Sequence, residues 1–204
     1  QTCALPILPW KVRAMLRAQR ALQKAHLFPT NAKLLRMPVE KRLAMGPSKG
    51  LVGPLPPVDA EDRQVATRDG GSIRVRVYRS KESTDQPLLY VHGGGFVVGG
   101  IASCDHMCRR LAHETGAVVV SVEYRLAPEH PDPAPVEDCY AGLVWTAKNA
   151  AEIGVDPQRL MIAGGSAGGG LAAGTALLAR ERAFPALSHQ VLVCPMLDDR
   201  LDTP

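Results

Sequence analysis

The sequence predicts an α/β fold with a mainly parallel sheet and helices on both faces. Short apolar runs alternate with longer helical segments from Pro87 onward, which is the pattern of repeated strand–helix units. Ahead of them, Ser72–Tyr78 alternates apolar and basic residues, as a half-buried strand does. A chain of 204 residues that is 46% hydrophobic and 22% charged is long and apolar enough to build one sizeable core.

Three segments precede the predicted sheet. The first, Gln1–Ile7, lacks an initiator Met and matches a translated sequencing adapter, so we expect an artefact there. Residues 8–50 predict cap helices, because apolar side chains recur at helical spacing among ten Lys or Arg residues and one acid. Such a basic amphipathic helix also suits a membrane surface, a nucleic acid or a transit peptide. Gly46–Pro57 is rich in Gly and Pro and predicts a linker.

Residues 51–204 are expected to form the sheet. Ile73, Val75 and Val77 face one side of their strand, and Asp69-Gly70-Gly71 predicts the turn of a hairpin that begins with Arg63–Arg68. The further predicted strands are Pro87–His92, Ala117–Glu123, Arg159–Ala163 and Gln190–Cys194. The predicted helices lie near Ser103–Thr115, Val136–Ile153 and Leu171–Arg180.

A serine lies where one strand turns directly into a helix. Gly164, Ser166 and Gly168 form a Gly-x-Ser-x-Gly motif, and a sharp turn there would push the serine side chain out as a nucleophile. A simple glycine-rich turn is the alternative. The dinucleotide-like pattern Gly168–Ala173 begins inside the helix, and no Lys-Ser or Lys-Thr follows as in a phosphate loop.

A second glycine-rich loop, His92-Gly93-Gly94-Gly95, follows another predicted strand. A serine that attacks an ester creates an oxyanion, which needs backbone N–H donors that no side chain obstructs. A Gly-Gly-Gly loop supplies such donors, and Ala167, the residue after the serine, supplies another. A loop that needs positive φ for its own reasons is the alternative.

Three blocks resemble the hormone-sensitive-lipase-like esterases, which are α/β-hydrolases. They are His92–Phe96, Val118–Pro131 and Gly164–Gly169, within a match that runs from about Arg63 to Pro204 and is weaker over the N-terminal helices. The resemblance implies an α/β-hydrolase fold with N-terminal cap helices. It also implies hydrolysis of short- to medium-chain acyl esters through an acyl-enzyme, with a small-molecule ester as the partner and no metal or organic cofactor.

The resemblance assigns roles to single residues. It makes Ser166 the nucleophile, and Gly94, Gly95 and Ala167 the donors of the oxyanion hole. It makes the Tyr124–Glu129 block a scaffold beneath the site, in which we expect Arg125 to pair with an acid.

The chain departs from the family pattern in two places. Gly165 stands where the family usually has Asp, and we expect this glycine to loosen the turn. The second departure concerns the triad, whose order in this fold is Ser, acid, His. His189 is the sole histidine after Ser166, and it precedes Asp198, Asp199 and Asp202. We therefore expect a fragment with the C-terminal part missing, the triad Asp and His beyond residue 204, and little or no activity.

Other observations bear on partners and location. Cys104 and Cys108 are spaced i, i+4, but two further zinc ligands are missing, so we expect the cysteines to be small core residues in a reducing, cytoplasmic compartment. No apolar run reaches membrane-spanning length, and aromatic residues do not interleave with basic ones, so neither membrane insertion nor nucleic-acid binding is expected. A homodimer of the complete protein is compatible with the sequence. Two other functions remain open: binding of a small ligand without hydrolysis, and acyl transfer to an alcohol.

Overall fold

The computed structural model describes residues 34–45 and 54–197. The predicted artefact, most of the predicted cap helices, most of the linker and the three aspartates after residue 197 lie outside the described residues. The chain divides into two units, Gln1–Pro38 and Val39–Pro204, and every element below belongs to the second unit.

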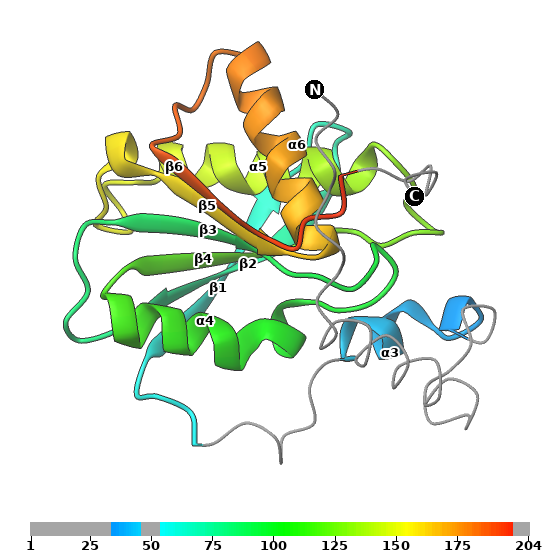
Figure 1. Ribbon diagram of the computed structural model, residues 1–204, viewed down its shortest axis with the longest axis horizontal. Helices are drawn as coiled ribbons and strands as arrows, with labels where there is room; N and C mark the ends of the chain where they lie inside the picture. Colours follow the sequence, from blue (N-terminus) through cyan, green and yellow to red (C-terminus); the bar gives the residue numbers. More distant parts are fainter. Residues whose placement is uncertain (1–33, 46–53, 198–204) are drawn as a thin grey trace, which may run out of the picture. The chain divides into compact units, whose positions relative to one another are not determined.

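The second unit contains one six-stranded sheet in the order β1-β2-β4-β3-β5-β6 (Figure 1). The hairpin strands β1 and β2 pair antiparallel, β2 also pairs antiparallel with β4, and the other strands run parallel. The strands are β1 Asp59–Ala66, β2 Ser72–Arg79, β3 Pro87–Val91, β4 Val118–Glu123, β5 Met161–Gly165 and β6 His189–Val193. The described helices are α3 Val39–Leu43, α4 Ile101–Thr115, α5 Ala134–Lys148 and α6 Ala167–Glu181.

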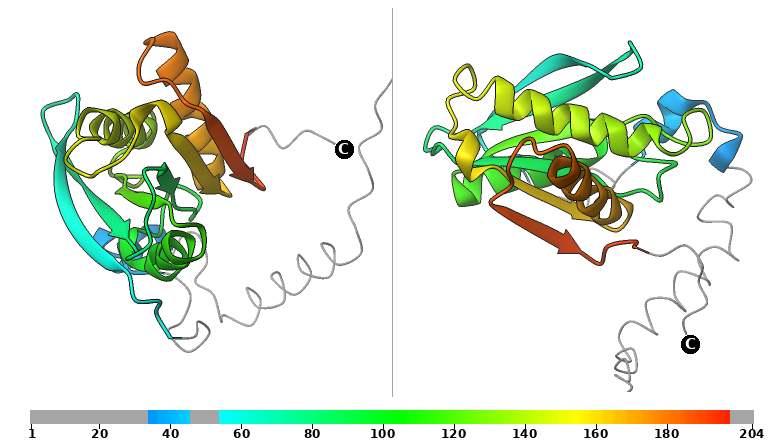
Figure 2. Two further views of the ribbon diagram at one scale, coloured as in Figure 1. Left: turned by 90° about the vertical axis from the view of Figure 1, so that its left-hand side faces the viewer. Right: turned by 90° about the horizontal axis from the view of Figure 1, so that it is seen from above.

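Helices cover both faces of this sheet. Helix α4 lies on one face, and α5 and α6 lie on the other (Figure 2). Both faces need covering because β4 carries apolar residues on both of its faces. Val120 belongs to the core beneath α5 and α6, and Val119 on the opposite face packs with Cys108 of α4. The predicted mainly parallel α/β fold is therefore confirmed. None of the helices in the described part of the chain has the length and apolar character that crossing a bilayer requires.

Several predicted boundaries are wrong. Strand β1 begins at Asp59 and ends at Ala66, rather than running over Arg63–Arg68. Three other boundaries differ for a local reason. Strand β5 begins two residues later than predicted, because Pro157–Arg159 forms a 3₁₀ turn capped by the Asp156 side chain. Helix α5 ends at Lys148 rather than near Ile153, and the Asn149 side chain donates to the carbonyl of Trp145 at this end. Helix α6 begins at Ala167 rather than at Leu171, because packing overrides the low helix propensity of its glycines.

The cysteine prediction holds for three residues and fails for one. Cys104, Cys108 and Cys139 are free and buried, as predicted for small core residues. Cys194 is exposed, because it follows the outermost strand β6 rather than lying inside the sheet.

Arg125 pairs with an acid, as predicted. Its guanidinium donates to both carboxylate oxygens of Asp138 at 2.9 and 2.7 Å, and its backbone N–H donates to the same carboxylate at 2.9 Å. Asp138 lies in α5 and is fully buried, and Asp69 of the hairpin turn contacts the same guanidinium at 2.7 Å. The pair therefore ties the segment after β4 to α5 and to the hairpin.

Replacing Asp138 with Ala should destabilise the fold by about 3–5 kcal/mol, because it leaves the Arg125 guanidinium and N–H without their buried partner. Urea unfolding measures this loss. Glu114→Ala is the matched control, since it removes an exposed partner of Arg110 on α4 and should change the free energy of unfolding little. Equal losses in the two variants would contradict a structural role for the buried pair.

Candidate active site

Ser166 is the single residue between β5 and α6, and its side chain is exposed. Its backbone has φ 56° and ψ −123°, an unusual conformation for a residue with a side chain. The surrounding backbone holds it there: the Ser166 N–H donates to Val193 at 2.9 Å, and the Ser166 carbonyl accepts from Gly169 at 3.0 Å and Met196 at 3.1 Å. This is the strained strand-to-helix turn that the Gly-x-Ser-x-Gly motif predicts.

The glycines on either side of Ser166 allow a close approach of backbones. A Cβ atom added at Gly168 would lie 2.2 Å from the carbonyl oxygen of Val91, and one added at Gly164 would lie 2.2 Å from the carbonyl oxygen of Gly168. The first turn of α6 is thus packed against the ends of β3 and β5 with no room for side chains. The glycine-rich composition therefore has a structural reason besides any catalytic one.

The second glycine-rich loop lies beside Ser166. In the parallel pair β3 and β5, Val91 lies opposite Gly164, so Gly93 comes next to Ser166 two residues further on. The geometry agrees, since a Cβ added at Gly93 would lie 3.4 Å from the Cβ of Ser166. Two segments some 70 residues apart in the sequence are thereby brought together at one edge of the sheet.

Three backbone N–H groups beside Ser166 have no hydrogen-bond acceptor among the described residues. Among the described residues, the N–H groups of Gly94, Gly95 and Ala167 donate to no other protein group. Gly94 and Gly95 have φ values of +132° and +58°, and Ala167 is the first residue of α6, where helix N–H groups favour negative charge. The arrangement offers backbone donors for an anion that forms next to the serine.

His92 supports the loop from below, a role that sequence reasoning missed. It is buried, its Nδ1 lies 2.8 Å from the carbonyl oxygen of Gly93, and its ring stacks on Tyr124 with 4.2 Å between centroids. Tyr124 in turn donates its hydroxyl proton to the carbonyl of His92 at 2.9 Å. Because that Gly93 oxygen can only accept, Nδ1 carries the proton, and burial lowers the pKa of His92. Its Nε2 atom has no hydrogen-bond partner among the described residues.

Gly165 differs from its neighbours in the turn. It is the last residue of β5, and a Cβ added there would meet nothing closer than the carbonyl oxygen of Val193 at 3.8 Å. A side chain therefore fits at this position, so the glycine is not required by packing. The expected loosening of the turn stays a prediction.

No base contacts Ser166 within the part of the chain that the structure describes, since its hydroxyl has no hydrogen bond to a histidine or a carboxylate there. His189 opens β6, as predicted, and pairs with Met161 at the far end of β5 from the turn. The same described ranges hold no group of three or more His, Cys, Asp or Glu side chains that could bind a metal ion.

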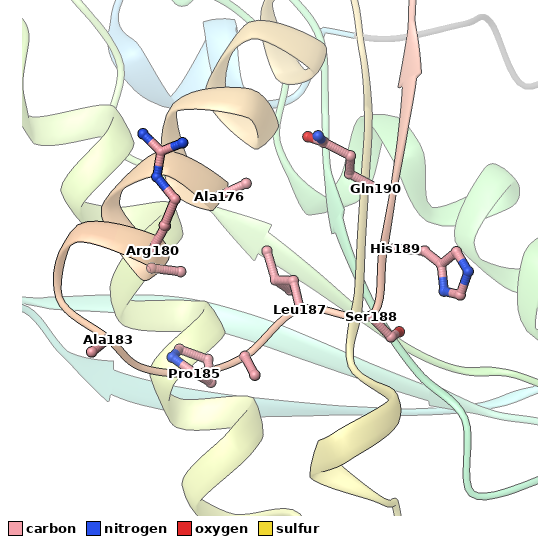
Figure 3. A pocket seen from close by; sticks show the side chains of 10 residues that line it. Ala176, Arg180, Ala183, Pro185, Leu187, Ser188, His189 and Gln190 are labelled. Atoms are coloured by element: carbon pink, nitrogen blue, oxygen red, sulfur yellow. The ribbon is translucent and has the colours of Figure 1, made fainter.

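One pocket of the described residues lies away from this site. It measures about 500 Å³ and is formed between the end of α6 and the start of β6, with Arg180, Leu187 and His189 among its walls (Figure 3). None of the residues around Ser166 contributes to it. The pocket is therefore not part of the candidate active site.

Comparison with known proteins agrees with this geometry. A family model described as alpha/beta hydrolase fold matches residues 88–204. The chain is 45% identical over 143 residues to carboxylesterase NlhH of Mycobacterium tuberculosis, covering 69% of this chain and 45% of that protein. It is 40% identical over 144 residues to ethyl acetate hydrolase of Pseudomonas putida, covering 67% and 45%. The chain thus spans about half the length of these relatives.

A solved structure is similar as well. The crystal structure of EstE1, a thermostable carboxylesterase from a metagenomic library, aligns with a TM-score of 0.73 and 42% identity. The alignment covers 85% of this chain and 58% of that one.

Adding a methyl group should have opposite effects on the free energy of unfolding at Gly168 and at Gly165. Gly168→Ala forces a Cβ into the Val91 carbonyl and should cost at least about 2 kcal/mol, because both partners are backbone and neither can move aside. Gly165→Ala places a Cβ in ordinary van der Waals contact with Val193. It should stabilise the protein by about 0.4–1 kcal/mol, because it reduces the conformational entropy of the unfolded chain. Urea unfolding of both variants measures the contrast, and a loss at Gly165 would show that this glycine is required.

The buried His92 should make stability depend on pH. Its folded pKa lies below the unfolded value of about 6.5, so the unfolded chain takes up the proton first, and stability is lost as pH falls below that value. His92→Asn keeps a side-chain N–H near the Gly93 carbonyl but does not titrate. Between pH 7.5 and 5 the variant should lose less unfolding free energy than the parent chain. If the unfolding free energies of the two proteins changed equally with pH, His92 would take up a proton in the folded state as readily as in the unfolded chain, and the prediction would be wrong.

Proposed function

The chain belongs to the α/β-hydrolase family, as its resemblance to the hormone-sensitive-lipase-like esterases predicted, and on that premise we propose that the protein is a serine carboxylic ester hydrolase. One observation carries the proposal. A serine in a strained turn stands directly beside a glycine loop whose N–H groups have no partner among the described residues, which is the combination that acyl transfer requires.

In the proposed reaction, the Ser166 hydroxyl oxygen attacks the acyl carbon of the ester. The carbonyl oxygen becomes an oxyanion, which the N–H groups of Gly94, Gly95 and Ala167 stabilise. Collapse of the tetrahedral intermediate releases the alcohol and leaves an acyl-serine, which water then hydrolyses to free acid and serine. The oxyanion donors lower the barrier because they stabilise charge that exists only during the reaction.

The serine proton needs an acceptor for this reaction to be fast. We propose that the histidine that accepts it, and the carboxylate that orients that histidine, come from outside the described residues. Without them, the oxyanion donors and substrate binding alone would leave only residual catalysis.

The substrate class is proposed from the resemblance and from the relatives. The resemblance implies short- to medium-chain acyl esters, and the name of the Pseudomonas putida relative, ethyl acetate hydrolase, supports the short end of that range. The other named relative is a carboxylesterase.

Replacing Ser166 with Ala tests the proposal. The reading frame is first sequenced past the codon for Pro204, and the protein that it encodes is expressed whole. We expect it to hydrolyse p-nitrophenyl acetate and butyrate faster than long-chain esters, and Ser166→Ala to lower kcat by roughly 10⁴-fold or more. Ser72→Ala, at an exposed serine of β2, is the matched control and should leave the rate unchanged.

Three results would contradict the proposal. Hydrolysis that survives Ser166→Ala would remove the serine from the reaction. Transfer of the acyl group to added methanol in preference to water would identify an acyltransferase. Binding of esters without any turnover would identify a ligand-binding protein on the same fold.

A further inference from the structure

Arg42 in the short helix α3 is a fully buried cation that the proposed reaction does not use. Its Nη1 donates to the carbonyl oxygens of Val97 at 2.9 Å and Ala127 at 2.7 Å. Its Nη2 pairs with the carboxylate of Glu129. A buried charge is costly unless it is hydrogen-bonded in this way, so the contacts define one orientation of the guanidinium.

The contacts of Arg42 converge on the loop that carries the proposed oxyanion donors. Besides the bond to Val97, the backbone carbonyl of Arg42 accepts a hydrogen bond from the N–H of Gly99 at 2.9 Å. The helix α3 therefore holds this loop, which runs from Gly94 to Gly99, by its side chain and by its main chain. The bond to Ala127 adds a second connection, because the Ala127 N–H donates to the carbonyl of Phe96 at 3.0 Å.

Hydrogen bonds within the loop connect the residues that Arg42 holds to the Gly94–Gly95 peptide. The N–H groups of Val97 and Val98 both donate to the carbonyl oxygen of Gly94, at 3.1 and 3.0 Å. The carbonyl of Gly94 and the N–H of Gly95 belong to one planar peptide unit, so fixing the carbonyl fixes the direction of that N–H. Phe96 has a φ of +65°, which a side chain rarely adopts, so the loop needs external contacts to keep this shape.

We propose that Arg42 is a positioning residue that holds this loop and thereby aims the N–H group of Gly95 at the oxyanion, an inference that rests on the proposed ester hydrolysis. Arginine suits the task because its rigid fork reaches two carbonyls and a carboxylate at once, whereas a lysine offers a single point charge. The role is indirect, since the partners of Arg42 named above are neither the serine nor the donors.

The proposal predicts a specific kinetic signature. The oxyanion forms only in the reaction, so misdirected donors should lower kcat and leave KM nearly unchanged. Losing one such donor costs about 10²–10³ in kcat, and we expect Arg42→Met to lose roughly 10- to 100-fold through partial misalignment. Arg42→Lys should recover part of the loss, because it restores the charge and one hydrogen bond.

The experiment compares these variants in the whole protein encoded by the reading frame. Rates are divided by the concentration of reactive serine, titrated with a fluorophosphonate, so that unfolded molecules do not count. Arg109→Met is the matched control. It also removes an ion pair, with Asp105, and a hydrogen bond to the carbonyl of Val58, but it lies on α4 rather than on α3. It should leave kcat per reactive serine unchanged. Should Arg42→Met not fold, Arg42→Lys carries the same comparison against Arg109→Lys.

Hydrogen exchange separates this proposal from that of ester hydrolysis. Peptides that cover residues 93–99 should exchange faster in Arg42→Met than in the parent protein, while the peptide of β4 should not. If Ser166-dependent hydrolysis is absent, ester hydrolysis fails, and faster exchange confined to the loop still supports the anchoring by Arg42. Unchanged exchange there, or a kcat per reactive serine equal to that of Arg109→Met, would overturn it.

Discussion

The contact on which the rest of the structure depends is the close approach of α6 to the ends of β3 and β5. The carbonyl of Val91 lies where a side chain at Gly168 would be, so the helix can start only if this position is bare. That contact sets the point at which the chain turns from strand to helix, and so places Ser166. It also brings the neighbouring strand close enough for its following loop to lie beside the serine.

The candidate site is consequently supported from several sides rather than by one element. Beneath the glycine loop, the stacked rings of His92 and Tyr124 hold the peptide before Gly94. On its far side, Arg42 binds the carbonyl of Val97. On the other side of the turn, the carbonyl oxygen of Val193, the last residue of β6, accepts a hydrogen bond from the N–H of Ser166. Strain at the serine is tolerable because the hydrogen bonds of its own N–H and carbonyl group, to Val193, Gly169 and Met196, hold its backbone in place.

Sequence reasoning found the parts of this site that lie in short contiguous motifs. The hairpin, the alternation of strands and helices, and the sharp turn at Ser166 follow from local patterns. The approach of Gly93 to Ser166 depends on the pairing of β3 with β5, which the sequence did not predict. The positions of Arg42 and His92 did not follow, because the partners of Arg42 lie 55 to 87 residues away and no spacing rule connects them. The predicted start of α6 was too late for a related reason, since tertiary packing rather than helix propensity places its glycines in the helix.

The position of β6 at the outside of the described sheet has a consequence for the protein in concentrated solution. Its outer edge pairs with no described strand, and Val191 and Val193 are 47% and 58% exposed. Such an edge is a template on which a strand of another molecule can add, with new hydrogen bonds as well as apolar contact. Self-association at high concentration and conditions for crystallisation should therefore depend on whether this edge is covered.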